Sequence, residues 1–146
     1  MPTWRGDHVW RCAWSMAAAL KARSSPRDAE ADLALLRVAG TGIPAALLAD
    51  AEALRVGSIV VAIGHPLGVR GALTAGIIHA MGPLVPGGRS WIQADVRLAP
   101  GNSGGPLADA SGRVVGLNAM IVGGLALAIP ISRVTEFVRA AGAKLA

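Results

Sequence analysis

Short apolar runs alternate with turn-forming residues along most of the chain after residue 31. Runs of this length, bounded by glycine, proline or polar clusters, predict buried β-strands. The expected strands are residues 32–38, 58–63, 73–81, 91–96, 106–108, 113–120 and 125–129. Many short strands joined by glycine- and proline-containing turns predict an antiparallel barrel or sandwich.

The connections between these strands carry turn signals of different strength. The sequence DASG at residues 109–112 predicts a hairpin. Residues 114–131 are uncharged and approach the length of a membrane span. Because Gly123, Gly124 and Pro130 interrupt this stretch, two buried strands joined by a Gly-Gly turn explain it better, and we expect a soluble chain with no membrane segment. Residues 39–57 are expected to form a connection with a loose helical turn.

Helical patterns occur near the two ends of the chain. We expect a helix that begins near Ser132, a plausible N-cap residue. The apolar positions Val134, Phe137, Val138 and Ala141 then share one face of that helix. Near the N-terminus the sequence WSMAAALKAR at residues 14–23 is predicted as a short helix by propensity.

The composition fits one globular domain of 146 residues, because 53% of the residues are hydrophobic and 16% are charged. The net charge of +5 comes mostly from arginines scattered singly, and aromatic residues make up 3%. Nucleic-acid-binding surfaces cluster their charge and interleave aromatic residues, so no nucleic-acid partner is expected. The single cysteine, Cys12, excludes an internal disulfide. We see no signal peptide, and we expect no metal and no cofactor.

Ser103 stands among glycines in the sequence LAPGNSGGPLAD, at residues 98–109. A tight surface turn is one interpretation of this cluster. A nucleophilic serine is the other, with neighbouring backbone N–H groups directed at a developing oxyanion. The pattern G-x-S-x-G also occurs in α/β-hydrolases, but there a helix follows the serine and the histidine comes later in the chain. Pro106 follows here, and no histidine lies beyond His79.

Two chain orders remain for a Ser-His-Asp triad. A subtilisin-like order could combine Asp32 with His65 or His79, although the spacing leaves no room for crossover helices. A chymotrypsin-like order is matched by His8, Asp32 and Ser103. In that order Ser103 is the nucleophile, His8 transfers the proton, and Asp32 orients the imidazole. The N–H groups of Gly101 and Ser103 would then hold the oxyanion.

Several segments, in order, resemble the trypsin-like serine proteases, and APGNSGGPL resembles the active-site segment of their HtrA/Deg branch. The resemblance extends over about residues 25 to 140, and its segments are ADLALLRV (31–38), GSIVVAIGHPLG (57–68), SWIQADVRLAPGNSGGPLADASGRVVGLNAM (90–120) and GLALAIPISRV (124–134). It implies an all-β, trypsin-like double β-barrel with a C-terminal helix and an active site between the barrels.

The resemblance also implies a function. It implies ATP-independent serine endoproteolysis of peptides and of unfolded or damaged proteins, in the periplasm or elsewhere outside the cytoplasm. A truncated barrel would also expose unpaired strand edges, which can associate into a homo-oligomer. The substrate-binding wall carried over from the family consists of Ala99, Pro100, Asn118, Ala119, Met120 and Ile121. This apolar wall, which lacks an acidic residue, favours a small or medium aliphatic P1 side chain.

The sequence departs from the family pattern in its first part. RGDHVW keeps only His-Val of the family's T-N-x-H-V-V segment, and His65 stands where the family has asparagine. We therefore expect a single domain over residues 1–146. Residues 1–50 are a truncated first barrel, residues 51–130 the second barrel, and residues 131–143 the helix, with no PDZ domain.

The alternative function is a catalytically weak or inactive peptide-binding module. In that case His8 is a frayed terminal residue and Asp32 is a solvated residue that caps its strand.

Overall fold

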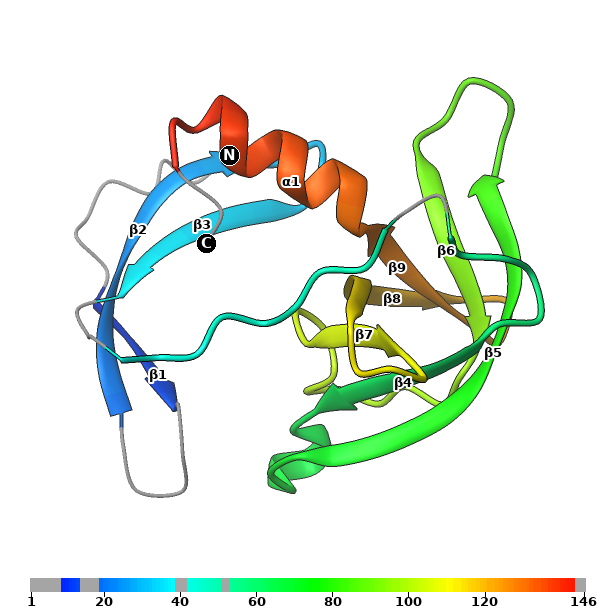
Figure 1. The fold of residues 1–146 in the computed structure, drawn as a ribbon, viewed down its shortest axis with the longest axis horizontal. Helices are drawn as coiled ribbons and strands as arrows, with labels where there is room; N and C mark the ends of the chain where they lie inside the picture. Colours follow the sequence, from blue (N-terminus) through cyan, green and yellow to red (C-terminus); the bar gives the residue numbers. More distant parts are fainter. Residues whose placement is uncertain (1–8, 14–18, 39–41, 51–52, 144–146) are drawn as a thin grey trace. The chain divides into compact units, whose positions relative to one another are not determined.

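The computed structural model describes residues 9–13, 19–38, 42–50 and 53–143, and it divides into two compact units. The first unit comprises Met1–Ala45 together with Phe137–Ala146, and the second comprises Ala46–Glu136. Figure 1 draws the three strands of the first unit in blue and cyan, and those of the second in green through orange.

The second unit is a closed antiparallel barrel of six strands in the order β4-β5-β6-β9-β8-β7 (Figure 1). The strands are β4 (Ile59–Gly64), β5 (Ala72–Pro83), β6 (Ser90–Asp95), β7 (Pro106–Asp109), β8 (Val114–Val122) and β9 (Leu125–Pro130). A short 3₁₀ turn, η1 (Pro66–Gly68), follows β4. All the strands expected in this region are present, with boundaries that differ by a few residues.

The barrel core is built from alternate positions of its strands. On β5, for example, Ile78 is fully buried whereas the side chain of Ile77 is 48% exposed. The packed core consists of Leu54, Val60, Ala62, Ile78, Ile92, Ala94, Val96, Leu107, Val115, Ala126 and Ala128. Residues on one face of a strand alternate with those on the other, so short apolar runs suffice to fill the barrel.

Both predicted tight turns are confirmed. The Asp109 carboxylate accepts hydrogen bonds from the N–H groups of Ser111 and Arg113, at 2.8 and 2.9 Å, and so closes the β7–β8 hairpin. Gly123 and Gly124 both have positive φ, +59° and +84°, and join β8 to β9. Two successive residues of positive φ match the right-handed twist of the flanking strands, which explains why glycine occupies both positions.

The first unit contains a three-stranded antiparallel sheet in the order β1-β2-β3. Its strands are β1 (Val9–Ala13), β2 (Ala19–Asp28) and β3 (Leu33–Val38). The helix predicted for residues 14–23 is therefore wrong from Ala19 onward, and residues 14–18 lie outside the described part. β2 pairs with β1 on one side and β3 on the other, and this pairing outweighs the modest helix propensity of its residues.

The connection and the helix differ in detail from expectation. Residues 42–50 contain no helix, and Leu48 forms a parallel bridge with Val114 of the barrel. Single turns follow, in which the N–H groups of Ala53 and Ser58 donate to the carbonyls of Asp50 and Arg55, at 3.1 and 3.0 Å. The helix α1 (Ile131–Ala140) begins at Ile131, directly after β9, so Ser132 lies inside its first turn and is not its N-cap. The predicted apolar face is half-buried, as expected. In the described part of the chain, no helix is long and apolar enough to cross a membrane.

Candidate active site

Ser103 lies in the loop between β6 and β7, with its side chain exposed. Its hydroxyl donates a hydrogen bond to the carbonyl oxygen of Ala119, at 2.9 Å. Ala119 lies on β8 where the pairing with β9 shifts by one residue, between Asn118 and Met120. The strand irregularity therefore brings a backbone carbonyl to the serine.

Gly101 gives this loop its shape. Its φ is +104°, a conformation that residues with a side chain rarely adopt, and a Cβ at this position would collide with the carbonyl oxygen of His65. The N–H of His65 donates to the carbonyl of Gly101 at 3.0 Å, and the N–H of Leu67 donates to that of Pro100 at 3.2 Å. The segment after β4 thus holds the loop that precedes Ser103.

The backbone N–H groups of the loop fall into two classes. Those of Asn102, Gly104 and Gly105 donate to backbone carbonyls at 2.7–3.0 Å. Those of Gly101 and Ser103 have no acceptor within the part of the chain that the structure describes. Two unpaired N–H groups, one of the exposed serine itself and one two residues before it, can receive an oxyanion that forms next to the hydroxyl.

The predicted substrate-binding residues occupy two segments of this unit. Ala99 and Pro100 precede the serine, and Met120 and Ile121 lie exposed on the last part of β8. Asn118 is almost completely buried, and its amide nitrogen donates to the carbonyl of Pro106 at 3.1 Å.

One edge of β8 is open next to these residues. β7 pairs with β8 as far as Leu117, whereas β9 pairs with it through Val122. Within the described ranges no strand covers the other edge of residues 119–122. An extended peptide can add to such an edge by main-chain hydrogen bonds.

Asp32 lies in the first unit, at the end of the turn between β2 and β3. Its φ is +57°, which aspartate tolerates better than most residues. The turn is stabilised by Asp28, whose carboxylate accepts the N–H of Ala31 at 2.8 Å. The Asp32 side chain is exposed, and its carboxylate has no hydrogen bond or ion pair in the described part. The turn-stabilising role therefore belongs to Asp28.

The three histidines lie in different segments of the chain, and two of them are in the described part. His8 lies outside the described residues. His65 and His79 are both exposed, His65 in the turn after β4 and His79 on β5. The structure thus brings together Gly101, Ser103 and Ala119, while the pairing of His8 with Asp32 and Ser103 stays a prediction.

A family model described as a trypsin-like peptidase domain matches residues 15–117 of this chain. The chain belongs to the trypsin-like peptidase family. The matched range of this peptidase domain contains Asp32 and Ser103 and begins after His8.

Similar proteins place the peptidase domain in the HtrA/Deg branch. This chain is 43% identical over 120 residues to a protein of Pseudomonas putida named probable periplasmic serine endoprotease DegP-like. It is 41% identical over 134 residues to a protein of the same name from Ectopseudomonas mendocina. These alignments cover 77% and 84% of this chain, which spans 25% and 28% of the two relatives. A solved structure described as HtrA-type protease AlgW with decapeptide matches at a TM-score of 0.80 and 34% identity. That match covers 85% of this chain and 41% of the other.

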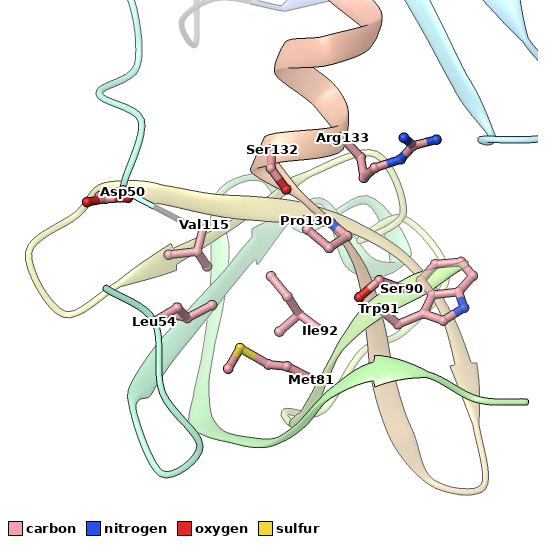
Figure 2. A pocket seen from close by; sticks show the side chains of 10 residues that line it. All are labelled: Asp50, Leu54, Met81, Ser90, Trp91, Ile92, Val115, Pro130, Ser132 and Arg133. Carbon is pink, nitrogen blue, oxygen red and sulfur yellow. The ribbon is translucent and has the colours of Figure 1, made fainter. Parts of the chain in front are cut away.

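The peptidase domain also has a cavity that contains none of the predicted site residues (Figure 2). Its volume is about 220 Å³, and it is lined by Asp50, Leu54, Met81, Ser90, Trp91, Ile92, Val115, Pro130, Ser132 and Arg133. The Ser132 hydroxyl is directed toward the cavity, whereas the guanidinium of Arg133 points away from it (Figure 2). Arg133 instead forms an ion pair with Glu136, at 2.6 Å.

Proposed function

We propose that this domain is a serine endopeptidase in which Ser103, His8 and Asp32 form the catalytic triad. The observation that carries the proposal is the pair of unpaired N–H groups, of Gly101 and Ser103, beside the exposed hydroxyl. The exposed carboxylate of Asp32 supports its assignment, because it is not engaged in stabilising its own turn.

The reaction follows from these roles. The Ser103 oxygen forms a bond to the carbonyl carbon of the scissile peptide while His8 takes the hydroxyl proton. The oxyanion that results accepts hydrogen bonds from Gly101 and Ser103 N–H. The C–N bond then breaks as His8 returns the proton to the leaving amine, which leaves an acyl-enzyme. Water, deprotonated by His8, attacks this ester and releases the second product and the free serine.

The substrate class is peptide in extended conformation, including unfolded or damaged proteins. The open edge of β8 at residues 119–122 can pair with the substrate backbone, and the structure neighbour is described with a decapeptide. Ala99, Pro100, Ala119, Met120 and Ile121 supply an apolar wall with no acidic side chain, suited to an aliphatic P1 residue. The curated relatives are named periplasmic, so we place the protein outside the cytoplasm.

The second candidate is a peptide-binding module with weak or no turnover. It is favoured by one observation, the hydrogen bond that the Ser103 hydroxyl donates to the Ala119 carbonyl, because this bond engages the hydroxyl proton with a backbone oxygen and not with a histidine of the described part. The same loop and strand edge would then bind peptide without cleaving it.

A series of fluorogenic peptides that differ only at P1 tests the substrate proposal. We expect kcat/KM for valine, alanine or leucine at P1 to exceed that for lysine, arginine or phenylalanine by about tenfold or more, the discrimination a fitted apolar pocket provides. The Ser103→Ala variant is the blank. Preference for a basic P1 residue would contradict the apolar wall, and binding without cleavage would favour the second candidate.

A further inference from the structure

Two asparagines occur in this chain, and both border the loop of Ser103. Asn102 directly precedes the serine, and Asn118 lies on the neighbouring strand β8. Asn102 is 3% exposed and Asn118 is 2% exposed. Among the described residues, these two are the buried residues with polar side chains. The sequence pattern alone marks Asn118 only as a wall residue, so this arrangement is visible in the structure alone.

Asn118 forms hydrogen bonds with the three residues that follow Ser103. Its carbonyl accepts the N–H of Gly104 at 2.7 Å, and its own N–H donates to the carbonyl of Gly105 at 2.9 Å. Its side-chain amide donates to the carbonyl of Pro106 at 3.1 Å. One residue of β8 therefore fixes the backbone on the C-terminal side of the serine.

Asn102 is packed as closely on the other side. Its N–H donates to the carbonyl of Ala99 at 3.0 Å, and its carbonyl accepts the N–H of Gly105 at 3.0 Å. A Cβ on Gly64 of β4 would collide with its side chain, so glycine at that position makes room for the amide. The loop that carries Ser103 is thus bonded to Asn118 of β8 and packed against β4 through the buried side chain of Asn102.

Asparagine at position 118 pairs its amide nitrogen but not its amide oxygen. Among the described residues, neither its buried Oδ1 atom nor that of Asn102 has a hydrogen-bond partner. An unpaired buried amide oxygen is destabilising. The other large side chains that are as fully buried, Ile78, Leu107, Leu127 and Val60, are all aliphatic. A leucine of similar volume at position 118 would avoid the unpaired oxygen but would also remove the donor of the Pro106 carbonyl, so what the amide contributes is this one hydrogen bond.

We propose that Asn118 is a positioning residue for the peptidase reaction, an inference that rests on the function proposed above. Its amide donor fixes the carbonyl of Pro106 and with it the course of the backbone from Ser103 to Pro106. The Ser103 hydroxyl and the two oxyanion donors are thereby held in their reactive geometry. Asn118 acts through this backbone and does not itself contact the reacting atoms.

The test compares Asn118→Leu and Asn118→Ala with the wild type in fluorophosphonate labelling, over a range of probe concentrations. Both variants remove the donor to the Pro106 carbonyl, and the leucine keeps nearly the same side-chain volume. We expect the maximal labelling rate to fall by about 10- to 100-fold, the loss that small displacements of reacting groups cause. The probe concentration that gives half of this rate should stay within about twofold, because the binding surface is unchanged. If the leucine variant does not fold, the alanine variant carries the test, because a smaller side chain cannot overfill the site.

Val115→Ala is the matched control, because Val115 lies on the same strand and is buried in the barrel core. It should lower the melting temperature and leave the maximal labelling rate per folded molecule unchanged. Wild-type labelling rates in both Asn118 variants would overturn the inference, as would an equal loss of rate in Val115→Ala. Absence of Ser103-dependent labelling in the folded wild type would overturn the proposed function, and the inference with it.

Discussion

Replacing Asp32 with asparagine is expected to lower kcat for peptide cleavage about 10⁴-fold, because a triad histidine without its carboxylate adopts the wrong tautomer. The fold should tolerate this change. The Asp32 side chain is exposed and has no hydrogen bond or ion pair in the described part, and asparagine accepts a φ of +57° as readily as aspartate. We expect Tm to change by less than about 3 °C. Steady-state cleavage and thermal unfolding of the same sample measure both effects.

Asp28→Asn is the control for this experiment. Asp28 lies at the other end of the same turn, and its carboxylate accepts the Ala31 N–H, a hydrogen bond that the asparagine oxygen can also accept. The kcat of Asp28→Asn should equal that of the wild type. A wild-type kcat in Asp32→Asn, or equal losses in the two variants, would show that Asp32 is not the triad carboxylate.

Replacing Gly101 with alanine is expected to lower kcat by about 10²- to 10³-fold, the loss caused by removing one oxyanion donor. The added Cβ would collide with the carbonyl oxygen of His65, and alanine disfavours a φ of +104°. The loop must therefore move, and the Gly101 N–H moves with it. Because the backbone strain also destabilises the fold, Tm should fall as well. Cleavage rates per folded molecule separate the two effects.

Gly112→Ala controls for the strain alone. Gly112 has a φ of +78° in the β7–β8 hairpin, and a Cβ there meets no atom within 4 Å. In this variant the free energy of unfolding should fall by about 1 kcal/mol, and kcat should stay unchanged. If Gly101→Ala loses no more kcat per folded molecule than Gly112→Ala, the N–H of Gly101 is not an oxyanion donor.

The barrel was predictable from the sequence because its signals are local. Residues 58–63 and 125–129 are apolar runs that end in glycine or proline, and DASG carries its own turn chemistry. The N-terminal segment was not predictable in the same way. Residues 19–23 have good helix propensity, but β2 gains hydrogen bonds from two neighbouring strands that no local pattern reveals.

The candidate site likewise has features that a local sequence pattern predicts and features that depend on strand pairing. Gly101 and Ser103 were predictable because the oxyanion loop is one contiguous segment. The hydrogen bond of Ser103 to Ala119 and the contacts of Asn118 with residues 104–106 were not, because they depend on how β7 and β8 pair. That Asp28 rather than Asp32 stabilises the β2–β3 turn also needed the structure, since both carboxylates lie near the start of β3 in the sequence.

The most direct measurement of the central claim is fluorophosphonate labelling of the folded protein beside Ser103→Ala and His8→Ala, with the site of the adduct mapped by peptide mass spectrometry. We expect an adduct on Ser103 in the wild type and no labelling in either variant. Folded wild-type protein that fails to react would contradict the claim of an activated serine. Full labelling of His8→Ala would contradict the assignment of His8 as the general base.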